Sequence, residues 1–212
     1  MMFPQVESYF YGLIHPIKTH HWLKFGIAPD SSQARSLPRL DVSLAISWGL
    51  AIVRGMVQLF LANLVIEAFM AFQNDDLFFF DLIDTQDALW PYYIFIFSTA
   101  IDVIFFPIMS LVVIEFWNFI IRFYARWLKV EGDHFVIADQ ITTVALSSNF
   151  FLVVPLIGDY ISKLCWPFLI YAGLRHNLGA SRSVSVVILL TPLVLTSMVI
   201  GSLLLVMYFC LA

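Results

Sequence analysis

Five long apolar runs separated by short polar breaks constrain this chain more than any other feature. In chain order they occupy Leu44–Phe72, Tyr92–Ile121, Phe135–Ile157, Ile161–Leu174 and Val184–Ala212. A helix rises about 1.5 Å per residue and the hydrocarbon core of a bilayer is about 30 Å thick, so four of the runs are long enough to cross it. Only 12% of the 212 residues are charged, against about 25% in a typical soluble domain. The sequence therefore predicts an all-α polytopic integral membrane protein with five transmembrane helices.

The segment 1–42 precedes the first run and has a different pattern. Its apolar residues recur at helical spacing, at Val6, Phe10, Leu13, Ile14 and Ile17. This spacing predicts an amphipathic helix that lies on the membrane surface, with Lys18 and Lys24 close to anionic lipid. A helix packed as a small cytosolic cap is the alternative. The expected organisation is this N-terminal amphipathic or cytosolic segment, followed by a five-helix membrane domain over residues 43–212.

Basic residues gather in the breaks on one side of the predicted bundle, which sets its orientation. Nine of them share that side: Lys18, Lys24, Arg35, Arg39, Arg122, Arg126, Lys129, Arg175 and Arg182. Only Lys163 falls on the other side. The bias predicts a cytoplasmic N-terminus and a C-terminus outside. The fourth run has 14 residues, so a re-entrant hairpin there is the alternative. It would move the C-terminus inside and place Arg175 and Arg182 outside, against the bias.

Ionisable side chains within the runs are costly in lipid, so each is a candidate functional residue. By position, Arg54 and Asp102 both fall near the middle of their runs, which predicts an intramembrane ion pair. Glu115 and Asp139 both fall near the cytoplasmic ends of neighbouring runs, which predicts an inner-leaflet acid pair that shares a proton. Two interpretations stay open. The charges lock helices together, or the acids line a path for protons, cations or substrate.

Small residues four positions apart predict close contacts between helices. Such pairs occur at Ala45 and Gly49 and at Ala51 and Gly55 in the first run, and at Ser197 and Gly201 in the fifth. The pair in the fifth run is the predicted contact for a second copy of the chain or for another membrane protein.

Motifs for common catalytic and metal chemistry are absent from the sequence. There is no phosphate-binding loop, zinc-binding helix or serine nucleophile elbow, so we expect no enzyme, no cofactor, no metal and no nucleic-acid partner. Five aspartates lie between the first two runs, but they lack the spacing of a calcium loop. Calcium binding there is a minor alternative. An intramembrane hydrolase built from Ser147, Ser148 and His176 is another, although these residues are more typical of interhelical hydrogen bonding.

Several short motifs occur in a familiar order. They are Tyr11-Gly12-Leu13-Ile14-His15-Pro16, Val154-Pro155-Leu156-Ile157-Gly158, Leu164-Cys165-Trp166 and Tyr171-Ala172-Gly173-Leu174-Arg175-His176. Over Tyr9–Lys24 and Asp133–Ala212 the chain resembles the Yip domain family of Ypt/Rab-interacting membrane proteins, and a bacterial-type member in particular. The resemblance implies five helices, a cytoplasmic N-terminus and a non-enzymatic protein. In eukaryotic members it implies binding of small GTPases. This chain shows no long N-terminal cytosolic region, which favours a relative in the bacterial inner membrane.

Two functions of different kinds follow. The first is a membrane-organising or partner-binding module of Yip type. The alternative is a small proton- or cation-coupled transporter or channel subunit that uses Asp102, Glu115 and Asp139. A binding module is expected to bury its acids in pairs, whereas a transporter is expected to expose them to a water-accessible cavity.

Overall fold

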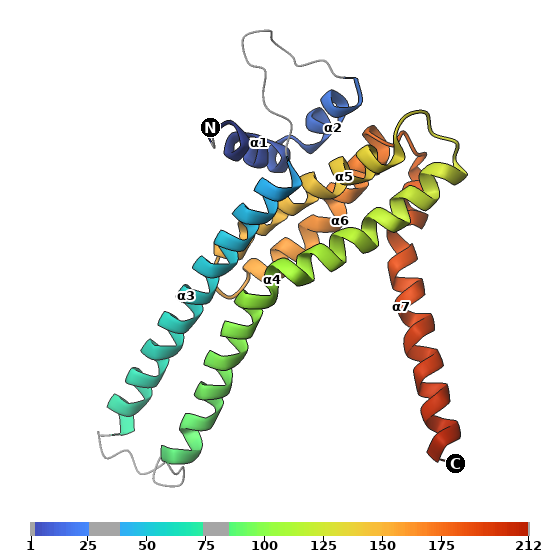
Figure 1. Cartoon of the computed structure of the whole chain (residues 1–212). Coiled ribbons are helices and arrows are strands. Elements are labelled where there is room, and N and C mark those ends of the chain that lie inside the picture. The colour runs from blue at the N-terminus through green and yellow to red at the C-terminus, as the bar shows by residue number, and fades with distance from the viewer. Residues whose placement is uncertain (1–2, 26–38, 74–84, 212) are drawn as a thin grey trace.

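Helices form all the regular structure in the part of the chain that the computed structural model describes, which is residues 3–25, 39–73 and 85–211 (Figure 1). The elements are α1 (Phe3–Ile14), α2 (Pro16–Phe25), α3 (Leu40–Gln73), α4 (Thr85–Trp127), α5 (His134–Ala145), the 3₁₀ helix η1 (Leu146–Val153), α6 (Gly158–His176) and α7 (Arg182–Leu211). Four segments are long and apolar enough to cross a membrane: Leu40–Ala68, Trp90–Trp127, His134–Val153 and Arg182–Phe209. The prediction of an all-α protein with long, apolar, membrane-compatible helices is confirmed.

The two longest helices, α3 and α4, run side by side in opposite directions (Figure 1). They approach closely at Gly55, where an added Cβ would lie 2.8 Å from Val103 Cγ2. Ala51, one turn earlier, is also buried, so the contact predicted from this small-residue pair is confirmed. The pair Ala45 and Gly49 makes no such contact, because no side chain in the described structure lies within 4 Å of a Cβ added at Gly49. α4 bends near its middle, where Pro107 removes a backbone hydrogen bond. Beyond the bend it packs against α5 and α7.

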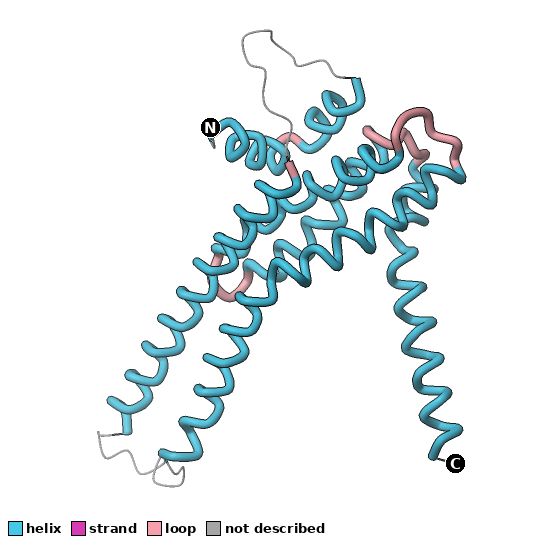
Figure 2. The backbone as a smooth tube through the Cα atoms, viewed as in Figure 1, coloured by secondary structure: helices cyan, strands magenta, loops and turns pink. Residues whose placement is uncertain are grey.

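The third apolar run is not one continuous α-helix. After Ala145 the backbone tightens into η1, in a stretch where serine side chains compete for backbone groups. Figure 2 shows the helices in cyan and the loops and turns that join them in pink. Ser147 Oγ donates a 2.7 Å hydrogen bond to the carbonyl of Val144. A short turn then reverses the chain into α6, and Leu156 adopts a positive φ of 66° within it. α5, η1 and α6 therefore form one hairpin.

This hairpin ends beside the middle of α3. Residues 154–156 and Gly158 border a small hollow together with Arg54, Val57 and Gln58 of α3. α3 continues from Gln58 to Gln73, which is about 22 Å further at about 1.5 Å per residue. The fourth run forms helix α6, but α6 is not among the helices long and apolar enough to cross a membrane. Four candidate spans therefore stand where five were predicted.

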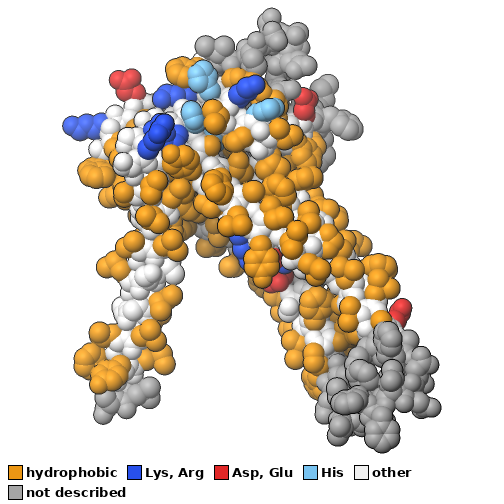
Figure 3. Space-filling view, turned by 180° about the vertical axis from the view of Figure 1, so that it is seen from behind, with side chains coloured by type: hydrophobic (Ala, Val, Ile, Leu, Met, Phe, Trp, Pro, Cys, Tyr) orange, Lys and Arg blue, Asp and Glu red, His pale blue; other side chains and the backbone are white. Residues whose placement is uncertain are grey.

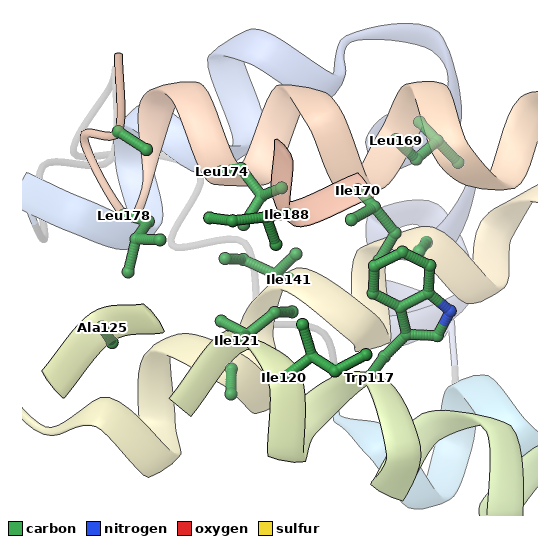
Figure 4. Close-up of a cluster of buried hydrophobic side chains, with 13 residues drawn as sticks. Trp117, Ile120, Ile121, Ala125, Ile141, Leu169, Ile170, Leu174, Leu178 and Ile188 are labelled. Carbon is green, nitrogen blue, oxygen red and sulfur yellow. The ribbon is translucent and has the colours of Figure 1, made fainter. Parts of the chain in front are cut away.

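The hydrophobic core lies at one end of the molecule. Ile121, Ile141, Ile170, Leu174 and Ile188 are fully buried there, and Figure 4 shows them converging from α4, α5, α6 and α7. Beyond this core, α7 stands apart from the α3–α4 pair (Figure 1).

The N-terminal helices pack onto the same end as the core. α1 contacts α3, α5 and η1, and α2 contacts α6. Tyr9 of α1 is only 2% exposed. Its hydroxyl donates a 2.7 Å hydrogen bond to the carbonyl of Leu146 and lies 3.1 Å from Ser47 Oγ. Lys18 and Lys24 remain exposed. The contacts are those of a packed cap, which was the alternative to a helix that only lies on the surface.

Tyr9→Phe is expected to destabilise the protein by about 1 kcal/mol, because the buried carbonyl of Leu146 loses its closer side-chain donor and keeps only Ser47 Oγ, which lies 3.5 Å away. Thermal unfolding in mild detergent measures the change. Tyr160→Phe is the matched control, since Tyr160 is 70% exposed and its hydroxyl has no hydrogen bond within the described residues. Equal stability of the two variants would contradict the docking of α1 through Tyr9.

Candidate functional site

A polar cavity of about 350 Å³ lies where α3, α4, η1 and α6 meet. Its charged and amide-bearing lining residues are Arg54, Gln58, Asp102, Asn149, Asp159 and Lys163. Apolar side chains of α4 complete the wall: Val103, Phe105, Phe106 and Met109. Four charged groups in one small cavity within an otherwise apolar region make it the strongest candidate site.

Arg54 forms its ion pair with an acid other than the predicted one. Its Nη2 lies 2.5 Å from Oδ2 of Asp159, and the two side chains are 24% and 29% exposed. Asp102 lines the same cavity, so the prediction that it shares the depth of Arg54 agrees with the structure. Asp159 takes its place as the partner because the hairpin turn carries the start of α6 against α3. The sequence analysis treated the apolar runs as separate spans. It therefore did not identify Asp159, which lies just before the fourth run, as the partner of Arg54.

Lys163 and Asn149 were also missed as site residues. Lys163 lies four residues after Asp159, so both occupy one face of α6. Ser162 Oγ donates a 3.2 Å hydrogen bond to Oδ1 of Asn149, which holds η1 against α6. The spacing of Asp159 and Lys163 at the start of an apolar run was the available signal.

Glu115 and Asp139 lie close enough for their charges to interact, but they are not enclosed together. Glu115 accepts a 2.9 Å hydrogen bond from Arg122 Nη2, and Asp139 accepts a 2.7 Å hydrogen bond from Asn118 Nδ2. Both acids are exposed on the outside of the fold, and neither lines the polar cavity. The structure therefore separates these acids from Asp102.

The other predicted site residues that the structure describes do not come together in a catalytic or binding site. Ser148 lies in η1, which α6 contacts through Ser162. His176 is the last residue of α6, about 21 Å further along the helix, so it is far from Ser148. Gly201 faces open space and Ser197 is exposed. The aspartates before Thr85 lie outside the described residues. Among the described residues, no group of three potential metal ligands occurs.

A buried histidine beneath the N-terminal cap is a second unusual feature. His20 of α2 is 0% exposed, and neither ring nitrogen has a hydrogen-bond partner among the residues that the structure describes. Its Cε1 lies against α6, 3.1 Å from where a Cβ on Gly173 would be. Burial, and to a lesser degree the nearby His176, lowers the pKa of His20 from 6.5 to about 3. The ring is therefore neutral in the folded protein at physiological pH.

This burial predicts a loss of stability in mild acid. In the unfolded chain His20 takes up a proton below about pH 6.5, while the folded chain resists protonation down to about pH 3. Above about pH 6.5 the free energy of unfolding should therefore not change through His20. Between pH 6.5 and pH 3 it should fall by about 1.4 kcal/mol per pH unit. His20→Leu removes this contribution without breaking a hydrogen bond. Thermal unfolding at pH 7.5 and 5.0 tests it, and an equal acid shift in both proteins would contradict the assignment.

Comparisons with models of protein families, with curated proteins and with solved structures find no match to this chain.

Proposed function

We propose that this chain is a non-enzymatic integral membrane protein of Yip type, which organises the membrane by binding a second copy of itself. Its N-terminus lies in the cytoplasm and its C-terminus outside, in a bacterial inner membrane. In this arrangement α3, α4 and α7 cross the bilayer, and the hairpin of α5, η1 and α6 enters and leaves on the cytoplasmic side. The segment His134–Val153, although long and apolar enough to cross, then forms one arm of the hairpin instead of a separate crossing. A hairpin has the same parity as two crossings, so it leaves the sidedness of both termini unchanged.

The distribution of basic residues supports this orientation. With five separate crossings, Lys163 was the one basic residue on the outer side. As part of a re-entrant hairpin it lies in the polar cavity instead, and the exception to the charge bias disappears. In this orientation the loops after α4 and α6 and the cap formed by α1 and α2 make up the cytoplasmic end of the molecule. Figure 3 shows basic and histidine side chains gathered at this end.

The proposal of self-association rests on the exposed second half of α7. From Leu193 to Phe209 every residue of α7 is exposed, although the start of the same helix packs into the core through Ile188. A helix anchored firmly at one end presents its other half in a fixed direction. Gly201 on this half offers a surface without a side chain, where a backbone can approach closely. A second copy offers the same surface in return, as a two-fold dimer requires.

The transporter alternative has less support. A path for protons or cations needs its acids in sequence along one cavity. All three acids are exposed, and Asp102 lines the polar cavity whereas Glu115 and Asp139 do not. Arg54 also neutralises Asp159 within that cavity.

Reconstitution into liposomes tests the proposal. We expect self-association, measured by energy transfer between labelled copies, and no proton or cation flux. Gly201→Leu should weaken the association, whereas Gly49→Leu should not. The two glycines are matched because neither has an atom within 4 Å of an added Cβ. Flux that disappears in Asp102→Asn or Asp139→Asn, or association that is indifferent to Gly201→Leu, would overturn the proposal.

A further inference from the structure

We infer that the cavity between α3, α4, η1 and α6 binds the headgroup of a zwitterionic phospholipid that carries a phosphate and a primary amine. This goes beyond the proposed self-association, which uses a different surface of the molecule. The inference rests on the charges that the cavity leaves uncompensated, on its unused hydrogen-bond donor and on its apolar opening.

The cavity contains two charges of each sign, and only one pair is satisfied internally. Arg54 and Asp159 neutralise each other at 2.5 Å. Lys163 and Asp102 line the same space and are exposed at its open side, and within the described residues neither forms an ion pair or a hydrogen bond. Isolated charges are strongly disfavoured in an apolar layer. A ligand with one negative and one positive group would compensate both.

An amide adds a donor on the floor of the cavity. Asn149 is 9% exposed, and its Oδ1 already accepts a hydrogen bond from Ser162. Its Nδ2 donates to no atom in the described structure, and the residue lines the cavity. Together with Lys163, this nitrogen can hold phosphate oxygens through charge-assisted and neutral hydrogen bonds. Asp102, on the opposite wall, can accept from an ammonium group.

The shape of the cavity favours a lipid over a free solute. A volume of about 350 Å³ lies at the small end of ligand pockets, which span about 300–1,000 Å³, so it suits a headgroup rather than a whole lipid. Phe105 and Met109 line the cavity and are also exposed, so the cavity opens on an apolar surface of α4. Acyl chains can stay in the bilayer while the headgroup enters from the side. Figure 3 shows basic and acidic atoms midway along an otherwise apolar surface.

Lipid binding to the full-length purified protein tests the inference, with native mass spectrometry as the readout. Phosphatidylethanolamine should bind at least about tenfold more tightly than phosphatidylcholine, whose quaternary ammonium has no N–H for Asp102, or phosphatidylglycerol, which has no amine. Water-soluble phosphoethanolamine should compete weakly, because it lacks the acyl chains. Asp102→Asn should abolish the preference for ethanolamine over choline. Lys163→Gln should weaken all three lipids by about tenfold. Glu115→Gln, outside the cavity, is the control.

Three results would overturn the inference: equal binding of the three lipids, phosphoethanolamine binding as tightly as the lipid, or unchanged lipid preference in Asp102→Asn. An interaction between Asp102 and Lys163 in a double-mutant cycle on lipid-free protein would also do so, because the two charges would then satisfy each other. The assay uses protein in detergent and does not depend on self-association, so its failure is distinguishable from failure of the proposed function.

Discussion

Arg54→Met is expected to cost about 3 kcal/mol of stability, because it leaves the carboxylate of Asp159 unpaired at the tip of the hairpin. Removing one partner of a buried ion pair costs about 3–5 kcal/mol. Arg54 and Asp159 are about a quarter exposed, so the lower end of that range applies. Asp159→Leu should have a similar effect, since it leaves the guanidinium unpaired.

The double variant Arg54→Met with Asp159→Leu should be more stable than either single variant, because no unpaired charge remains. Thermal unfolding in mild detergent provides the double-mutant cycle. Asp102→Leu is the matched control: combined with Arg54→Met it should give additive losses, because Arg54 pairs with Asp159. Strong coupling of Arg54 to Asp102, with none to Asp159, would restore the pairing first predicted from the sequence.

Gly158→Ala is expected to destabilise the hairpin by about 3 kcal/mol, the upper end of the usual range for overpacking. A Cβ at this position would overlap the backbone carbonyl oxygen of Phe151. Backbone atoms cannot turn aside as a flexible side chain does. The turn would therefore have to open, and Asp159, the next residue, would move away from Arg54.

Gly49→Ala is the matched control for this effect. Gly49 has nothing within 4 Å of an added Cβ, and alanine is favoured over glycine in a helix by about 1 kcal/mol. Unfolding midpoints of the two variants should thus shift in opposite directions. A Gly158→Ala protein as stable as the unchanged chain would show that the turn does not pack as described.

Hydropathy located the helices because bilayer-compatible helices need long apolar runs. The runs beginning at Leu44 and Val184 correspond to α3 and α7, and the fourth run, Ile161–Leu174, lies within α6. Small-residue spacing also located the close approach at Gly55. These features are local, so a single sequence reveals them.

The site depends on a feature that local patterns do not encode. Hydropathy treats each run as a crossing, and it cannot tell a full crossing from half of a hairpin. The end of α5 and the entry into η1 reflect side-chain competition at Ser147, which has no effect on hydropathy. Once the chain reverses near Leu156, Asp159 meets Arg54 and Lys163 enters the cavity. Depth alone had suggested Asp102 as the partner.

The N-terminal cap shows the same limit. Apolar spacing predicted its helical character, and helices occur at Phe3–Ile14 and Pro16–Phe25. The side chains that fix it are polar: Tyr9 reaches the carbonyl of Leu146, and His20 is buried against α6. A search for an apolar face does not find such contacts.

Thiol labelling at the tip of the hairpin tests most directly whether α5, η1 and α6 form the proposed re-entrant hairpin. In a background lacking Cys165 and Cys210, Leu156→Cys should resist an impermeant thiol reagent applied to intact cells, and it should react only after denaturation in detergent. Leu156 is 82% exposed on the protein surface, so protein packing would not hide it. Asp81→Cys should react from outside and Ser36→Cys should not. Labelling of Leu156→Cys from outside as rapidly as Asp81→Cys would show that the hairpin crosses the membrane as two separate spans.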